Sequence, residues 1–245
     1  MVCPQLPPIR GARTTDTITV FPAAVHQWST KQPESYPGSG TTWYDIVGTL
    51  DLQEHSVGTM PTYNASTKDF TFLNSALKSA PLTESNSPLL TNIHKGDRDF
   101  TIIMRANLDD NAATTKVIMG TRGSSGCGIQ LSQSASSSDL FCSVLVDGSW
   151  GGSEAITEQL STYETLVMSY DSTNDILYFG YAEDSPTVFT DYLGGSNADT
   201  LDNNEPFYVG LLLPTNDRHI SGEISDIIVT NTYYTDFSSI NAFFA

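Results

Sequence analysis

The stretch SYPGSGTTWYDIVGT, residues 35–49, does not have the composition of an ordinary connecting loop. Its Pro-Gly pair predicts a turn, since proline presets φ and glycine tolerates φ above zero. A Gly-Thr-Thr run then leads directly into Trp43, Tyr44 and Asp45. We expect Trp43 to pack in the interior, as we do for Trp28, and we expect Asp45 to cap a turn.

Outward from this stretch, the chain is a succession of short apolar segments. They are rich in Val, Ile, Thr, Tyr and Phe and are bounded by Gly, Asn, Asp and Pro, which is typical of sandwiches and barrels. The polar run DSTND between two of them predicts a hairpin. The expected strands are residues 17–21, 69–73, 99–108, 114–122, 127–133, 140–148, 164–171, 175–183, 186–193, 206–214 and 221–234.

Three segments depart from this pattern. Residues 1–15 contain three prolines and predict an extended N-terminal arm, which leaves residues 16–245 as a single sandwich. Residues 75–92 are expected to be an irregular surface loop. Near the end, Asp236 predicts the N-cap of a short helix. The apolar face of this helix would consist of Phe237, Ile240 and Phe244.

The charge of the chain is strongly one-sided, with 28 acidic against 11 basic residues and a net charge of −17. Such a surface repels phosphate backbones and anionic lipids, so we expect no nucleic-acid partner and no membrane insertion. No segment approaches the ~18–20 apolar residues of a membrane-spanning helix. The N-terminal MVCPQLPPIR lacks the apolar core of a signal peptide, and we therefore expect synthesis in the cytoplasm without Sec-type export.

The three cysteines do not suggest a disulfide scaffold, because their number is odd. Cys127 and Cys142 flank an expected hairpin centred near Ala135 and would lie opposite each other in it. That arrangement permits a cross-strand disulfide, whereas cytoplasmic synthesis favours two partly buried thiols.

The order of the motifs resembles that of laminin-G-like, concanavalin A-like jelly-roll domains. In that family a W-x-D-x-S-G element leads to a G-P-x-Y turn and an F-x-F-D-G strand. The corresponding segments here are WYDIVG (43–48), GTMPTY (58–63) and DFTFLNS (69–75), and the later strands follow in the family's order up to a terminal helix. The resemblance covers residues 16–245 and implies an all-β jelly-roll sandwich.

The chain departs from this family where relatives place polar residues that bind Ca²⁺. Val47 stands where the family often has Ser, Asn74-Ser75 replaces an Asp-Gly pair, and HQWST (26–30) replaces an Asp-Ala segment. The resemblance leaves Asp45 as a candidate calcium ligand beside its interpretation as a turn cap, and no other cofactor is implied.

Catalytic patterns are missing from the sequence. A glycosidase of this fold needs carboxylates at alternate strand positions, about 5–5.5 Å apart for retention. Glu223 and Asp226 are three residues apart and are expected on opposite faces, and Glu154 and Glu158 have no acid between them. The histidines at positions 26, 55, 94 and 219 lie in unrelated segments, and no G-x-S-x-G or P-loop motif is present. We therefore expect no enzymatic activity.

Two functions from different classes fit these expectations. The wording SYPGSGTTWYD resembles domains of phage virions, which implies a virion location and a structural role as a capsid decoration or tail-associated protein. The arm would then attach a homo-oligomer to capsid or tail proteins. The alternative is a lectin-like carbohydrate-binding module, with or without Ca²⁺, and a virion protein of this kind would also contact host surface glycans.

The candidate sugar site lies in the Gly-rich segment VDGSWGG (146–152). Trp150 would offer an aromatic platform, and Asp147 would offer hydrogen-bonding oxygens beside it. The alternative is that Trp150 folds back over the edge of the sheet.

Overall fold

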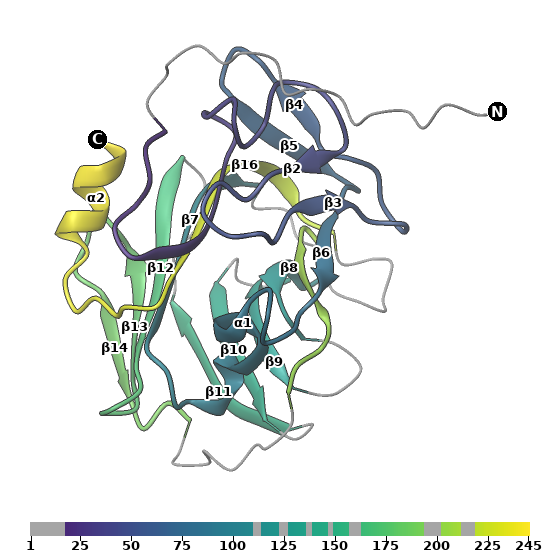
Figure 1. The fold of residues 1–245 in the computed structure, drawn as a ribbon. Coiled ribbons are helices and arrows are strands. Elements are labelled where there is room, and N and C mark those ends of the chain that lie inside the picture. The colour runs from purple at the N-terminus through teal and green to yellow at the C-terminus, as the bar shows by residue number, and fades with distance from the viewer. Residues whose placement is uncertain are drawn as a thin grey trace.

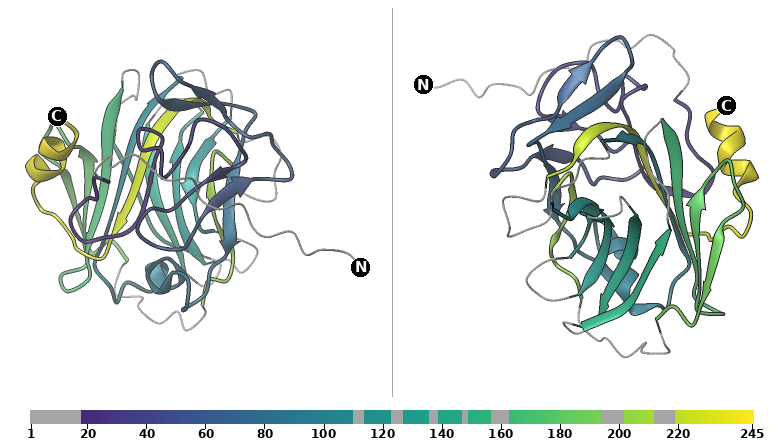
Figure 2. Two further views of the ribbon diagram at one scale, coloured as in Figure 1. Left: turned by 45° about the horizontal axis from the view of Figure 1, so that its top comes forward. Right: turned by 180° about the vertical axis from the view of Figure 1, so that it is seen from behind.

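The computed structural model describes residues 18–109, 114–122, 127–135, 139–146, 149–156, 163–193, 202–211 and 219–245. Two antiparallel sheets face each other across a shared apolar core (Figures 1 and 2). This architecture is the all-β, concanavalin A-like jelly-roll sandwich that the sequence predicts. The expected arm, residues 1–15, lies outside the described residues.

The first sheet has the order β14-β13-β12-β7-β16-β5-β4, and β1 also pairs with β16. Its strands are β1 (Ala24–Ser29), β4 (Thr62–Asn64), β5 (Asp69–Leu73), β7 (Phe100–Leu108), β12 (Glu164–Asp171), β13 (Ile176–Tyr181), β14 (Thr187–Thr190) and β16 (Ser221–Thr230).

The second sheet has the order β11-β10-β9-β8-β15-β6-β3-β2. Its strands are β2 (Thr42–Trp43), β3 (Leu52–Glu54), β6 (Leu77–Pro81), β8 (Lys116–Gly120), β9 (Gly128–Gln133), β10 (Leu140–Val146), β11 (Ser149–Ile156) and β15 (Pro206–Val209). The helical elements are α1 (Pro88–Asn92), the 3-10 turn η1 (Ile93–Lys95) and α2 (Ser238–Phe244).

Both tryptophans expected in the interior are fully buried between the sheets. The Trp28 ring stacks on Phe207 at 5.5 Å between centroids, and its Nε1 donates a hydrogen bond to the Leu50 carbonyl. Trp43 meets Phe70 edge to face at 5.1 Å. These large rings contribute much of the apolar area that the sandwich removes from water.

Strand β16 contains a bulge that changes which residues share a face. Its register against β7 shifts between Ile224 and Asp226, so that Glu223 lies opposite Asn107 and Asp226 lies opposite Arg105. The prediction that Glu223 and Asp226 face opposite sides was therefore wrong, because the extra residue of a bulge reverses the alternation.

Helix α2 packs against the outer side of the first sheet (Figures 1 and 2). Phe237 and Ile240 are buried there and Phe244 is half-buried, which confirms the predicted apolar face. The helix begins at Ser238, one residue later than expected, and Asp236 Oδ1 accepts a hydrogen bond from the Ser238 N–H. Within the described residues, no helix has the length and hydropathy that crossing a membrane requires.

Two local predictions were wrong. The described part of 17–21 is not a strand. Phe21 is buried against α2, and β1 begins after a turn in which Ala23 has φ 58°. Segment 75–92 is not wholly irregular, because it contains β6 and α1. Ser87 accepts a hydrogen bond from the Leu90 N–H, and Pro88 occupies the first turn, so a capping signal was present in the sequence.

The hairpin of β9 and β10 has a different register from the one expected. Cys142 lies opposite Leu131, and Gly128 lies opposite Leu145, so Cys127 and Cys142 do not face each other. Both cysteines are buried thiols outside any disulfide of the described chain. Burial raises the pKa of the Cys142 thiol to about 12, so it stays protonated at neutral pH.

The packing of α2 can be tested by the substitution Ile240→Ala. Ile240 is fully buried under the outer face of the sheet, and its truncation should lower the free energy of unfolding by about 2–4 kcal/mol. Urea denaturation followed by tryptophan fluorescence measures this change. Leu73→Ala, at a residue that is 68% exposed, should alter stability by less than about 0.5 kcal/mol. Equal effects of the two variants would contradict this packing.

Candidate functional site

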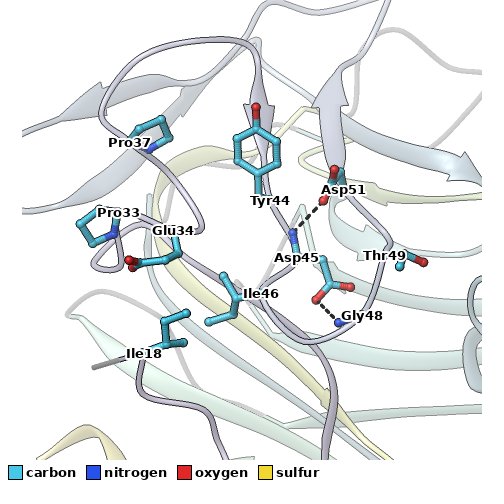
Figure 3. Close-up of a pocket in the computed structure, with 10 residues that line it drawn as sticks. All are labelled: Ile18, Pro33, Glu34, Pro37, Tyr44, Asp45, Ile46, Gly48, Thr49 and Asp51. Carbon is cyan, nitrogen blue, oxygen red and sulfur yellow. Dashed lines mark hydrogen bonds between the residues drawn. The ribbon is translucent and has the colours of Figure 1, made fainter. Parts of the chain in front are cut away.

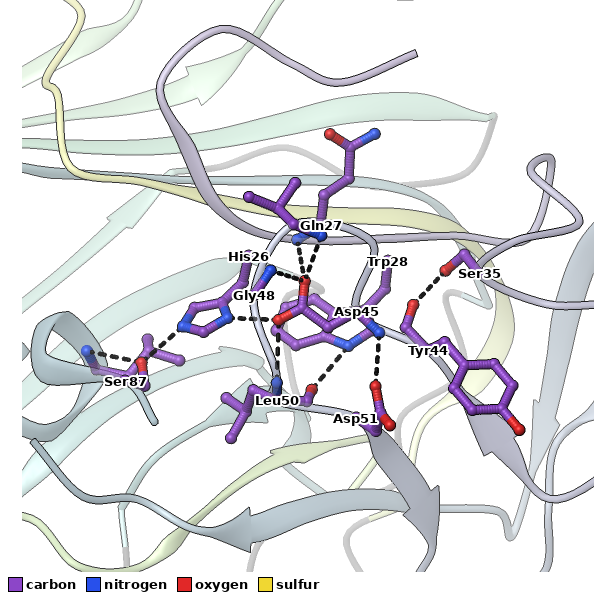
Figure 4. Close-up of polar contacts among 12 residues, drawn as sticks. His26, Gln27, Trp28, Ser35, Tyr44, Asp45, Gly48, Leu50, Asp51 and Ser87 are labelled. Carbon is purple, nitrogen blue, oxygen red and sulfur yellow. Dashed lines mark hydrogen bonds and ion pairs between the residues drawn. The ribbon is translucent and has the colours of Figure 1, made fainter. Parts of the chain in front are cut away.

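The carboxylate of Asp45 is the centre of a buried hydrogen-bond network (Figure 4). Its Oδ1 accepts hydrogen bonds from the backbone N–H groups of residues 27, 47 and 48, and its Oδ2 accepts one from residue 50. The Nδ1 of His26 lies 2.6 Å from Oδ2. Asp45 is therefore the predicted turn cap, and it holds the 45–50 loop against β1.

The electrostatics of Asp45 follow from these contacts. Burial alone would raise the pKa of this carboxyl, but the hydrogen bond and charge of His26 and the backbone N–H groups of Gln27 and Gly48 outweigh it. The pKa is lowered as a result, and the folded state holds an ionised carboxylate.

Gly48 is required by the close packing around this carboxylate. A Cβ atom at this position would lie 2.6 Å from Asp45 Oδ2, 2.7 Å from His26 Nδ1 and 2.8 Å from the Val25 carbonyl oxygen. No side chain fits there without displacing the network, so the last glycine of the 35–49 stretch has a packing role.

The network continues from His26 to α1. His26 Nε2 lies 2.8 Å from Ser87 Oγ, which produces a Ser-His-Asp series that the separate positions of these residues in the sequence did not suggest. The His26 ring thus places Nδ1 against the Asp45 carboxylate and Nε2 against the Ser87 hydroxyl. Ser87 is fully buried and caps α1, so the series joins β1, the 45–50 loop and α1.

A surface hollow of about 550 Å³ lies beside this network (Figure 3). We call it the Tyr44 hollow. Its lining residues are Ile18, Pro33, Glu34, Pro37, Tyr44, Asp45, Ile46, Gly48, Thr49 and Asp51. Most of them come from the turn at 33–37 and from the loop that Asp45 holds in place.

The Tyr44 ring is exposed at this hollow although its main chain is fixed. The Tyr44 N–H donates to the Ser35 carbonyl at 2.8 Å, and the Tyr44 carbonyl accepts the Ser35 hydroxyl at 2.6 Å. Tyr44 is 40% exposed, and its ring projects away from the network (Figures 3 and 4). Asp51 Oδ1 accepts a hydrogen bond from the Asp45 N–H, which places a second carboxylate close by.

The Tyr44 hollow thus combines an aromatic surface with polar groups. Tyr44 supplies the ring, Glu34 and Asp51 supply carboxylate oxygens, and Thr49 supplies a hydroxyl. A site of this composition can stack on an apolar ligand face and hydrogen-bond to hydroxyl groups at its edge. The signal for this site is present in WYD, although that segment was predicted only to pack and to form a turn.

The residues predicted to bind sugar lie elsewhere. Asp147 is outside the described residues, and Trp150 lies in β11 opposite Leu145, in a strand at the edge of the second sheet. The Gly-rich segment does not form a loop at Trp150, because Trp150 belongs to β11 and Gly152 pairs with Val144 after a register shift. The role of both residues stays a prediction.

The calcium candidate Asp45 uses both of its oxygens within the protein, as described above. In the part of the chain that the structure describes, no three His, Cys, Asp or Glu residues are grouped so that they would hold a metal ion.

No family model and no curated protein matches this chain. Solved structures do share its fold. A sialidase of Trypanosoma rangeli in complex with sialic acid matches with a TM-score of 0.59 and 14% identity, over 92% of this chain and 33% of the sialidase.

Botulinum neurotoxins give similar matches. The binding domain of serotype D/C has a TM-score of 0.65 at 9% identity, over 91% of this chain and 51% of that structure. A structure of type C, whose cell entry depends on interaction with two ganglioside molecules, has a TM-score of 0.65 at 11% identity, over 91% and 50%. This chain spans about a third of the sialidase and half of the toxin structures, and identities this low establish a common fold alone.

The role of Asp45 predicts a specific dependence of stability on pH. Asp45→Asn should lower the free energy of unfolding at pH 7 by about 3 kcal/mol, because an amide cannot accept all five hydrogen bonds. The folded-state pKa is below the ordinary 3.8, so the stabilisation by Asp45 is complete well above pH 3.8 and is lost as pH falls through the folded value.

Urea titrations of both proteins between neutral and acidic pH measure this difference. The gap between wild type and Asp45→Asn should close as the pH falls below 3.8. Asp97→Asn is the matched control, since that side chain is 57% exposed, and it should leave stability nearly unchanged. A gap that persists undiminished at low pH would contradict the assignment.

Proposed function

We propose that this chain is a non-enzymatic carbohydrate-binding module and that the Tyr44 hollow is its binding site. The observation that carries the proposal is the exposed Tyr44 ring on a main chain fixed by Ser35 and Asp45. Because the main chain at Tyr44 is already positioned, a ligand that stacks on the ring loses little entropy in ordering the backbone.

The chemistry of the hollow suits a saccharide. A sugar ring has an apolar C–H face and a rim of hydroxyl groups, so it needs both an aromatic surface and hydrogen-bonding groups. The carboxylates of Glu34 and Asp51 accept hydrogen bonds from sugar hydroxyls, and the Thr49 hydroxyl can donate or accept. The similar structures bind sialic acid or gangliosides, which supports a glycan ligand for this fold without naming it.

The first test is a substitution at the ring. Tyr44→Ala should weaken binding of the best oligosaccharide found on a glycan array by about tenfold or more, because loss of a central aromatic contact residue costs about 2 kcal/mol or more. Isothermal titration calorimetry measures the affinity. Val188→Ala, on β14, is the control for an exposed side chain outside the hollow and should bind as the wild type does.

A parallel Trp150→Ala variant separates this site from the one predicted in the sequence. Loss of binding in Trp150→Ala with full binding in Tyr44→Ala would overturn the assignment to the Tyr44 hollow and favour the second sheet's edge. Failure of every array saccharide to bind would overturn the module itself.

We also propose that the module serves in a virion, as a decoration or tail-associated protein that meets host surface glycans. The support is the resemblance of SYPGSGTTWYD to domains of phage structural proteins. Quantitative mass spectrometry of purified particles from the natural source tests it. Copy numbers close to those of the shell protein indicate decoration, a few copies indicate the tail, and absence from particles contradicts the proposal.

A further inference from the structure

A second surface hollow, of about 440 Å³, is lined by several basic side chains, although the protein as a whole is acidic. We call it the basic hollow. Its lining includes Lys31, Lys68 and Arg105, three of only 11 basic residues in a chain with 28 acidic ones. The carboxylates in the lining are Glu34 and Asp226. Their two charges leave this hollow with a net positive charge on a molecule of net charge −17.

Arg105 is held in place on the outer face of the first sheet. It belongs to β7, and its Nη1 donates a hydrogen bond to the Phe244 carbonyl at 3.1 Å. Its guanidinium lies 5.7 Å from the centre of the Tyr163 ring and 5.6 Å from that of Phe244. These contacts fix a permanent positive charge, since arginine keeps its proton at all relevant pH values.

The two lysines lie on exposed turns. Lys31 Nζ is 3.4 Å from Asp226 Oδ2, and Asp226 also accepts the hydroxyls of Ser29 and Ser225. Lys68 has φ 56°, and its carbonyl accepts the Thr30 hydroxyl at 2.6 Å, so its turn is anchored to the end of β1. Both lysines are exposed residues, and the ammonium of Lys31 is paired with Asp226.

The basic hollow adjoins the Tyr44 hollow. Pro33 and Glu34 line both of them, so the two lie on the two sides of one turn. Gln32 fixes this turn to the chain before β1, because its amide donates to the Thr19 carbonyl at 2.7 Å and accepts from the Thr19 N–H at 3.2 Å.

We infer that the basic hollow is a subsite for the carboxylate of an acidic saccharide whose neighbouring ring stacks on Tyr44. The inference rests on the proposed function for the class of ligand, and adds that the saccharide carries a carboxylate. Guanidinium and ammonium groups recognise this group by charge-assisted hydrogen bonds. A dense polyanion suits the site less well, because the surface outside the basic hollow repels it.

Matched ligands and matched variants test the inference by calorimetry at low salt. The probes are 3′-sialyllactose and a hyaluronan tetrasaccharide, each compared with its own carboxyl-reduced form. The wild type should bind at least one acidic probe about five- to tenfold more tightly than its reduced form, a gain expected for two or three exposed ion pairs. The gain should shrink as salt is added.

The double variant Lys31→Gln/Lys68→Gln should lose that gain and bind the reduced probe as the wild type does. Lys78→Gln/Lys116→Gln removes the same charge from β6 and β8 of the other sheet and should retain the gain. Both pairs leave the core intact, and urea denaturation verifies that the proteins are folded.

The outcomes separate this inference from the proposed function. Equal affinity for acidic and reduced probes, or loss of the gain in both double variants, overturns the subsite and leaves the Tyr44 module in place. No binding of any probe or array saccharide overturns both. A gain with sialyllactose alone identifies a sialic acid ligand, and a gain with the tetrasaccharide alone identifies a uronic acid.

Discussion

The buried carboxylate of Asp45 is the interaction on which the surface around it depends. Four backbone N–H groups and the His26 ring converge on its two oxygens, so the 45–50 loop cannot move independently of β1. A hydrogen bond to a charged group contributes about 1.5–3 kcal/mol, and a donor left without its acceptor costs a similar amount. The 45–50 loop, which follows Tyr44, is therefore held by electrostatics rather than by a regular ladder.

The same network explains how a loop provides a fixed binding surface. His26 connects Asp45 to Ser87, and Ser87 caps α1, whose leucines enter the core. The series of polar side chains from Asp45 through His26 thus ends at Ser87, which adjoins the apolar core through α1. Tyr44 is next to Asp45 in the chain, but its side chain is exposed. Asp45 therefore holds the loop, and Tyr44 is available to a ligand.

The bulge in β16 has an equally direct effect on the outer face of the first sheet. β16 pairs with β5 before the bulge and with β1 after it, so one strand supports two different neighbours along the same edge. The extra residue also brings Asp226 opposite Arg105. The basic hollow is built at this change of partner, where the end of β1 and the turn before β5 come together.

Elements with local sequence signals could be predicted without the structure. β5 and β12 span the residues predicted, because apolar runs bounded by polar turns define them, and the terminal helix follows its own apolar spacing. The structure was needed to find the β9–β10 register that separates the two cysteines, the bulge in β16, the pairing of His26 with Asp45, and the place of Lys31 and Arg105 in one hollow. These depend on contacts between distant segments, and a change of one residue in register moves a side chain to the other face of a sheet.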